Sequence, residues 1–241
     1  TADAGGAMAI TENVLLESTI FELNAATGGK GGATYTNRLE NPVVGPNPIT
    51  FNYCTLRNNF AALDGGAVYE SSNPLVLQNT LFDTNTITAN GNGGAVWVSG
   101  DLTIFDVSFN MNTATGNLAE QGFGGAIYYV SSANEVQGQL VDVEFTYNGG
   151  RNENGATIRG GAMYIDIPNC ISPNAADLDY PITFNRVLFE GNGLTANFNN
   201  GSLGADGGAL FAGNNSWVFM NDCTFNNNIV HNANTGTDGL A

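Results

Sequence analysis

The chain has 241 residues, of which 12% are charged and 42% hydrophobic, and its 22 acids against six Lys and Arg give a formal net charge of −16. This charge disfavours nucleic acid and anionic membrane surfaces as partners, and the apolar content is too high for a disordered chain. No segment approaches the roughly 20 apolar residues that span a bilayer, so we expect no membrane insertion by this segment.

A short phrase repeats along the whole chain. Gly-Gly-Ala is followed each time by an apolar stretch that ends in Phe-x-x-Asn or Leu-x-x-Asn. The seven copies of the first phrase begin at Gly5, Gly31, Gly65, Gly93, Gly124, Gly160 and Gly207, and the second phrases occupy residues 21–24, 56–59, 82–85, 109–112, 145–148, 189–192 and 225–228. Self-similarity of this kind predicts a stacked repeat protein.

Two further positions keep their character in every copy. Two residues before the Phe or Leu lie Thr19, Cys54, Thr80, Val107, Val143, Val187 and Cys223, and five before it lie Leu16, Phe51, Leu77, Ile104, Leu140, Phe184 and Met220. The step from five to two changes parity, which indicates a bend between two short strands, and the residues after Gly-Gly form a third. Three short strands per repeat predict an all-β parallel β-helix (solenoid) of about seven coils, with Cys54 and Cys223 in its core.

The Asn of each second phrase turns a corner of the coil. We expect its amide to bond to the same Asn one coil away, which would satisfy polar groups at the corner. A ligand-binding role for these Asn residues is a much weaker interpretation.

An aromatic position follows each Gly-Gly-Ala at a fixed distance. It holds Tyr35, Tyr69, Trp97, Tyr128, Tyr164 and Phe211, while the intervening position holds mostly aliphatic residues. We place the aliphatic side chains inside the coil and the aromatic ones outside, as a strip. The strip is either stacked on itself beneath inserted loops or a docking surface for sugar rings or a partner protein, and both interpretations remain open.

One row of the repeat suggests catalysis, though weakly. Asp142, Arg186 and Asp222 lie three residues before the anchor on successive copies, and carbohydrate-active β-helices place carboxylates on adjacent coils. The row lacks a second column of acids or bases, so an exposed ion-pair ladder is favoured and no catalytic residue is assigned. We expect no enzyme activity, no cofactor and no metal site.

The copies differ mainly in their insertions. A single β-helix segment over residues 1–241 is expected, with loop insertions at 37–48, 166–181 and 193–206, as part of a longer solenoid or of an assembly. Cys170 lies in the second insertion, either as a free thiol or as a cross-link to another chain. Asn200 and Asn214 begin Asn-x-Ser sequences that would accept glycans in a eukaryotic secretory pathway.

The paired phrases resemble the repeat of the polymorphic outer-membrane proteins of chlamydiae. Residues 93–96, 124–127 and 207–210 match its first half, and residues 82–85, 109–112 and 225–228 match its second, whereas Thr34 and Leu56 depart from it. The resemblance implies a right-handed parallel β-helix, export, and adhesive or structural work at a cell surface.

The expected function is therefore a non-enzymatic extracellular or cell-surface solenoid, serving as an adhesive stalk or as a building block of an appendage or filament. Its expected partners are other copies or chains of a surface assembly, or host or glycan ligands. A carbohydrate-binding or polysaccharide-cleaving protein is the alternative.

Overall fold

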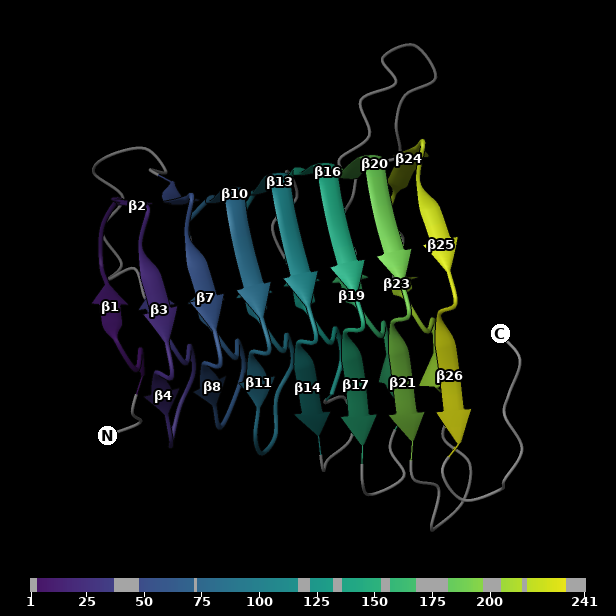
Figure 1. Cartoon of the computed structure of the whole chain (residues 1–241), viewed down its shortest axis with the longest axis horizontal. Helices are drawn as coiled ribbons and strands as arrows, with labels where there is room; N and C mark the ends of the chain where they lie inside the picture. Colours follow the sequence, from purple (N-terminus) through teal and green to yellow (C-terminus); the bar gives the residue numbers. More distant parts are fainter. Residues whose placement is uncertain are drawn as a thin grey trace.

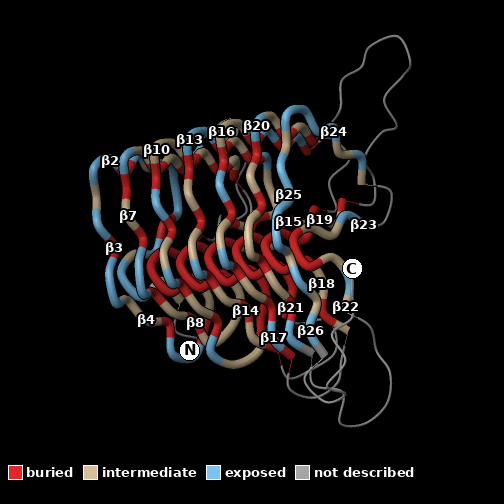
Figure 2. Tube along the Cα trace, turned by 45° about the vertical axis from the view of Figure 1, so that its right-hand side comes forward, coloured by how far each residue is buried: buried red, intermediate tan, exposed pale blue. Residues whose placement is uncertain are grey.

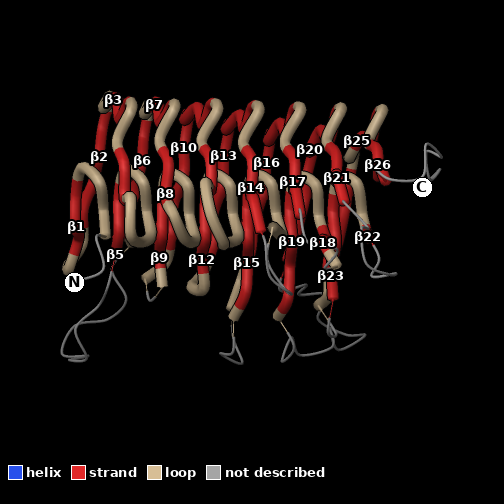
Figure 3. Tube along the Cα trace, turned by 90° about the horizontal axis from the view of Figure 1, so that it is seen from below, coloured by secondary structure: helices blue, strands red, loops and turns tan. Residues whose placement is uncertain are grey.

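The strands of the computed structural model wind into a parallel β-helix. The structure describes residues 4–36, 48–71, 73–116, 122–131, 136–152, 157–167, 182–196, 205–213 and 216–232. In Figure 1 the front strands run downward while the chain advances from left to right and returns behind, so the coil is right-handed. The predicted fold class is confirmed, and Figure 3 shows the successive coils side by side.

Three parallel sheets form the walls. Sheet A carries the strands that follow Gly-Gly-Ala. In the described part of the chain it comprises β1 (Met8–Ile10), β5 (Thr34–Thr36), β9 (Val68–Glu70), β12 (Val96–Val98), β15 (Ile127–Val130), β19 (Met163–Asp166) and β23 (Leu210–Gly213).

Sheet B forms the front wall in Figure 1 and carries the apolar stretches that lead to Phe-x-x-Asn. Its upper part comprises β2 (Val14–Glu17), β6 (Ile49–Asn52), β10 (Leu75–Asp83), β13 (Leu102–Asn110), β16 (Gly138–Thr146), β20 (Ile182–Glu190) and β24 (Val218–Asn221). Its lower part is completed by β3 (Ile20–Glu22), β7 (Thr55–Arg57) and β25 (Thr224–Asn226).

Sheet C follows the Asn corner. It comprises β4 (Ala25–Ala26), β8 (Phe60–Ala61), β11 (Thr86–Ile87), β14 (Thr113–Gly116), β17 (Gly149–Asn152), β21 (Gly193–Ala196) and β26 (Ile229–Asn232). A short pair, β18 (Ile158–Arg159) with β22 (Ala205–Asp206), lies between sheets C and A along the chain.

The strand register reproduces the columns read from the sequence. Phe82 pairs with Leu56 and Phe109, and these anchors are buried together with the residues two and five positions earlier (Figure 2). Neighbouring anchor rings stack with centroids 4.7–5.0 Å apart from Phe82 to Phe225. Cys54 is buried in this core, as predicted, and Cys223 packs against it from the last described coil.

Each coil turns through residues with left-handed backbone conformation. The bend within sheet B has φ between 47° and 55° at Ser18, Tyr53, Asn79, Asp106, Asp142, Arg186 and Asp222. A second such position, two residues after the anchor, holds Leu23, Asn58, Thr84, Met111, Tyr147, Gly191 and Asn227. The parity change in the sequence therefore marks a left-handed bend at which the chain keeps its pairing on both sides.

The bend does not always separate two strands. In β10, β13, β16 and β20 the two short strands that the sequence predicted form one nine-residue strand, because ladder hydrogen bonds resume directly after the bend. Only the first two coils and the last described one have separate strands there.

The repeat glycines meet two demands. Gly31 has a φ of 68°, which L side chains rarely adopt, and it begins the turn into sheet A. At Gly32 an added Cβ would overlap the backbone carbonyl oxygens of Gly66 and Phe60. The first glycine supplies a conformation, and the second allows neighbouring coils to approach closely.

The corner Asn residues form a continuous buried ladder. The Nδ2 atoms of Asn24, Asn59, Asn85, Asn112, Asn148 and Asn192 each donate to the Oδ1 of the next Asn at 2.9–3.0 Å, and the ladder ends at Asn228. Each Oδ1 also accepts the backbone N–H of the preceding Asn, as at Asn112, which accepts from Asn85 at 2.9 Å. The structural interpretation of these residues is confirmed.

One interior position departs from its column. Gly138 lies between Leu102 and Ile182, where the column otherwise holds large apolar residues. A Cβ there would lie 3.0 Å from the ring of Tyr129, which is fully buried and donates its hydroxyl to the carbonyl of Gln137 at 2.9 Å. The missing side chain at Gly138 makes room for that ring.

The predicted insertions correspond only in part to the structure. Residues 193–196 are strand β21, paired with β17 and β26, and residues 205–206 are strand β22, so the insertion expected at 193–206 begins too early and ends too late. The insertion expected at 166–181 also begins too early, because Asp166 is the last residue of β19. The prediction took the extended stretch after Asn192 for a loop, whereas it pairs like its counterparts in other coils. Residues 37–47 and 168–181 of the other two insertions, with Cys170, Asn200 and Asn214, lie outside the described residues.

Candidate functional site

The aromatic strip is a stacked ladder on the outside of the coil. Parallel pairing brings Tyr35, Tyr69, Trp97, Tyr128, Tyr164 and Phe211 into register, while Val68, Val96, Ile127 and Met163 point into the core. Successive rings stack with centroids 4.4–6.3 Å apart. The placement of aliphatic residues inside and aromatic ones outside is confirmed.

In three coils the residue that precedes Gly-Gly-Ala covers part of the strip: Lys30, Phe123 and Arg159. Lys30 lies 4.3 Å from the ring centroid of Tyr69 and donates to its hydroxyl at 3.1 Å. Phe123 stacks on Tyr164 at 4.9 Å. Sequence reasoning missed this second layer, although its signal is present as a fixed position beside the repeat glycines.

At the C-terminal end of the strip, Arg159 makes the same kinds of contact as Lys30. It lies 4.8 Å from the ring of Phe211 and bonds to Asp206, the equivalent residue of the next coil, at 3.1 Å. Lys30 likewise bonds to Asp64 of the next coil at 2.9 Å. Each cation therefore holds two coils together while it covers aromatic surface.

Burial changes the acid–base behaviour of the strip. Burial raises the pKa of Tyr164 to about 12, with help from the nearby Asp166 carboxylate. It also raises the pKa of Tyr69, against the opposing effect of Lys30. Burial alone would lower the pKa of Lys30, but its bonds to Asp64 and Tyr69 prevail and raise it. Lys30 is thus a charged clamp, unsuited to act as a base at neutral pH.

The exposed part of the strip is small. Tyr69 and Tyr164 are only 8% and 5% exposed, and Phe123, Ile158, Tyr164 and Leu194 form a second apolar cluster outside the coil. Tyr35, Trp97, Tyr128 and Phe211 are each half-buried. Only these four edges are accessible to a sugar ring or a partner.

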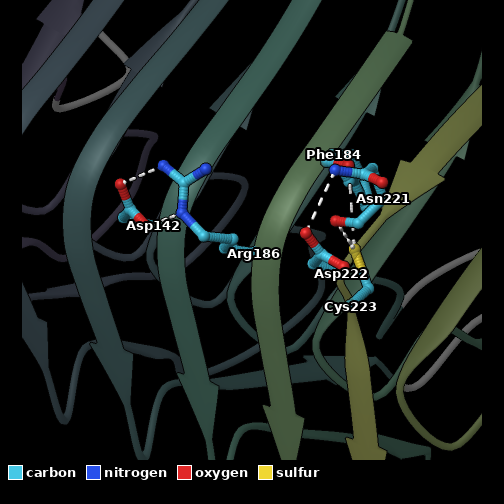
Figure 4. A network of polar contacts seen from close by, with 6 residues as sticks. All are labelled: Asp142, Phe184, Arg186, Asn221, Asp222 and Cys223. Atoms are coloured by element: carbon cyan, nitrogen blue, oxygen red, sulfur yellow. Dashed lines mark hydrogen bonds and ion pairs between the residues drawn. The ribbon is translucent and has the colours of Figure 1, made fainter.

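The Asp–Arg row does not converge on one point. Figure 4 shows Arg186 reaching toward Asp142 and away from Asp222. Its Nε and Nη2 donate to the two carboxylate oxygens of Asp142 at 2.6 and 2.7 Å, whereas Asp222 accepts from Asn221 at 3.3 Å. The three residues occupy successive left-handed bends on the outside of sheet B.

The electrostatics of the row oppose acid catalysis. The hydrogen bond from Arg186 lowers the pKa of Asp142, and Asp142 in turn raises the pKa of Arg186. A general acid at neutral pH needs a carboxyl whose pKa is raised. The arrangement is that of an exposed bidentate ion pair between coils.

Other kinds of site find little support among the described residues. No group of three His, Cys, Asp or Glu residues is placed to hold a metal ion in that part of the chain. Nor does it contain a helix long and apolar enough to cross a membrane. The Cys54 thiol lies 3.3 Å from the carbonyl oxygen of Leu16, as suits a small buried core residue.

Comparison with known proteins yields two distant relatives. No family model matches the chain, and no solved structure matches it. It is 30% identical over 218 residues to "Probable autotransporter YfaL" of Escherichia coli (strain K12), a match that covers 78% of this chain and 16% of the relative. It is 29% identical over 170 residues to "Probable outer membrane protein pmp6" of Chlamydia pneumoniae, covering 68% of this chain and 11% of the relative.

The chain thus spans about a sixth or less of the length of these relatives. Their names agree with the resemblance drawn from the repeat, and they support the predicted extracellular or cell-surface location. The chain is a parallel β-helix, and its similarity to these two proteins agrees with a location outside the cell or at its surface.

Proposed function

We propose that the chain is a non-enzymatic β-solenoid of the cell surface, acting as an adhesive stalk or as a building block of an appendage or filament. The carrying observation is that the Asn ladder and the stacked core run through the coils without interruption. The groups that could do chemistry are engaged between coils: Arg186 binds Asp142, and Lys30 binds Asp64. Such cross-links favour a stiff rod over a reaction centre.

The proposal is tested against catalysis with the purified protein. Polysaccharides of several linkage types are incubated with it, and reducing ends are measured, with a glycan array run in parallel. A scaffold releases no product. Release that is lost in Asp142→Asn and Asp222→Asn variants would refute the non-enzymatic assignment.

The last described coil offers a surface for stacking. Met220 and Phe225 are 38% and 49% exposed, whereas Phe184 and Phe189, which hold the same columns one coil earlier, are fully buried. A further coil with the same columns, from a longer chain or from another copy, would cover them. The contact that we propose is therefore coil upon coil, in continuation of the solenoid.

Two phenylalanines provide a matched test of stacking between copies. Phe225 belongs to the interior column, whereas Phe219 lies on the outer face of the same coil with a similar exposure. We expect Phe225→Glu to lower the association measured by sedimentation velocity and Phe219→Glu to leave it unchanged. Equal effects of both variants would contradict stacking through the interior columns.

Carbohydrate binding is the second candidate, and the half-buried edges of the aromatic strip favour it. Trp97→Ala should weaken glycan binding if the strip is the site, because its ring is the largest of the accessible ones. Phe105→Ala, on the outer face of sheet B, is the aromatic control. If neither variant changes glycan binding, the strip is not the glycan site.

A further inference from the structure

The outer face of sheet B differs from the other walls of the solenoid. Outside the strip of sheet A lie Lys30, Phe123 and Arg159. No described segment crosses the outer face of sheet B, which Figure 1 shows from the front. It is a parallel sheet with a repeat of about 4.8 Å between strands.

Exposed apolar side chains gather on this face. Among the described residues before 216, every large hydrophobic residue that is strongly exposed belongs to the outer face of sheet B or to its two bends: Leu15, Ile20, Leu23, Tyr53, Leu81, Phe105, Met111 and Tyr147. Phe105 is 46% exposed and pairs in register with Val141 of the next coil. These side chains alternate with polar ones across the strands, as Leu15 pairs with Thr50 and Leu81 with Ser108, so the face mixes apolar and polar groups as the rim of a protein interface does.

Bulky residues also occupy strained positions on this face. Tyr53 and Tyr147 have φ values of 51° and 55° and are 61% and 60% exposed, so their burial does not compensate for the conformation. Asn58, Gly191 and Asn227 fill equivalent bends at lower steric cost. The ring of Tyr147 packs over Gly191 of the next coil, where a Cβ would overlap it, whereas Tyr53 has no such glycine beneath it among the described residues, and its strain points to a function for the side chain.

The charge of the face is strongly negative. Among the described residues it carries eight acids (Glu17, Glu22, Asp83, Asp106, Asp142, Glu144, Glu190 and Asp222) and two basic residues, Arg57 and Arg186. Both arginines are already bound, to Glu22 and Asp142. Asp106, which follows Phe105, and Glu144, three residues beyond its strand partner Val141, have no such cation among the described residues.

We propose that the outer face of sheet B docks a basic protein surface that presents apolar side chains of its own. Charge complementarity selects this occupant, because a second copy of the same face would bring acids against acids, and an anionic lipid or nucleic acid would be repelled. Phe105 and Val141 supply the apolar centre, and Asp106 and Glu144 supply charges at its margin. This inference rests on the proposed adhesive function and names the partner class for it.

Synthetic peptides of defined composition test the proposal. A 12-residue Lys/Phe peptide, a Lys/Ser peptide of the same charge and a Glu/Phe peptide are titrated against the folded chain, and hydrogen exchange maps the protected amides. We expect the Lys/Phe peptide to bind most tightly and to protect strands β10, β13 and β16. Phe105→Ser should weaken it about fivefold or more, and Glu144→Gln about two- to fivefold at low salt.

A charge control separates local from general attraction. Glu12→Gln makes the same change in net charge at an exposed position outside the strands of sheet B. Equal weakening by Glu12→Gln and Glu144→Gln, or equal affinity for the Lys/Phe and Lys/Ser peptides, would overturn the proposal. The proposal would also be overturned if a neutral glycan protected the amides of this face from exchange and the Lys/Phe peptide did not. None of these results bears on the assignment of a non-enzymatic scaffold, which the reducing-end assay tests separately.

Discussion

Replacement of one ladder amide should destabilise the solenoid strongly. Asn112 is fully buried, and its Oδ1 accepts both the backbone N–H and the Nδ2–H of Asn85, each at 2.9 Å. Its own Nδ2 donates to the Phe82 carbonyl at 3.0 Å and to the Asn148 amide oxygen at 2.9 Å. Asn112→Ala removes all four of these bonds.

The magnitude follows from the groups left without partners. The backbone N–H of Asn85 and one of its amide hydrogens lose their only acceptor, since the other amide hydrogen donates to Leu56. A buried unsatisfied donor costs roughly 1–3 kcal/mol, so the two donors of Asn85 make Asn112→Ala cost about 2–6 kcal/mol. The Cβ that remains cannot fill the corner, and water that entered it would offset part of this cost.

Asn110→Ala is the matched control. Asn110 lies two residues away on the outside of sheet B, where it donates to Asp83 at 2.7 Å in contact with solvent. We expect that change to cost under about 1 kcal/mol. Denaturant unfolding followed by circular dichroism compares the two variants, and hydrogen exchange at Asn85 reports the local break, because repeat proteins need not unfold in two states. Equal destabilisation by the two variants would refute the argument that the buried hydrogen bonds of Asn112 carry the stability.

Three further outcomes are expected. Gly138→Val should destabilise the fold by roughly 1–3 kcal/mol through overpacking, and Tyr129→Ala should relieve part of that cost in a double-mutant cycle by unfolding. Arg186→Gln should raise the pKa of Asp142 toward its ordinary value in an NMR titration, because the ion pair with Arg186 lowers that pKa in the folded protein. Any stability that the ion pair contributes is present above the ordinary carboxyl pKa and is lost as the pH falls through the lowered pKa of Asp142. Tyr164 should ionise near pH 12 in an ultraviolet titration, and since its folded pKa is raised from 10.0, stability should fall between about pH 10 and 12, less so in Tyr164→Phe.

The core of the fold could be predicted because the same physical demand recurs in every coil. A buried column such as Leu77, Ile104 and Leu140 must stay apolar, and a corner that buries backbone groups must keep Asn85 or Asn112. Alignment of the copies therefore shows what a single copy cannot.

The features that sequence reasoning missed occur in single coils or pairs of coils. The exchange of volume between Gly138 and Tyr129 takes place between two columns, so neither column shows it alone. The cover that Lys30 and Phe123 provide uses different residue types at one position, which hides its common role. The aligned repeats showed that the Asp–Arg row shares one position in successive coils. Only the structure showed its left-handed backbone conformation and the direction of the Arg186 side chain.

The Asn ladder gives the solenoid a direction. From Asn24 to Asn192, each Nδ2 donates to the Oδ1 of the next Asn, so the amide-to-amide hydrogen bonds all run from the N-terminal coil to the C-terminal one. A coil that joins at either end must present the matching half of the pair, since a reversed coil would set donor against donor or acceptor against acceptor. If copies of the chain stack end to end as proposed, their growth would be polar and heterologous, and it would give a filament with distinct ends instead of a closed twofold dimer of ladder ends.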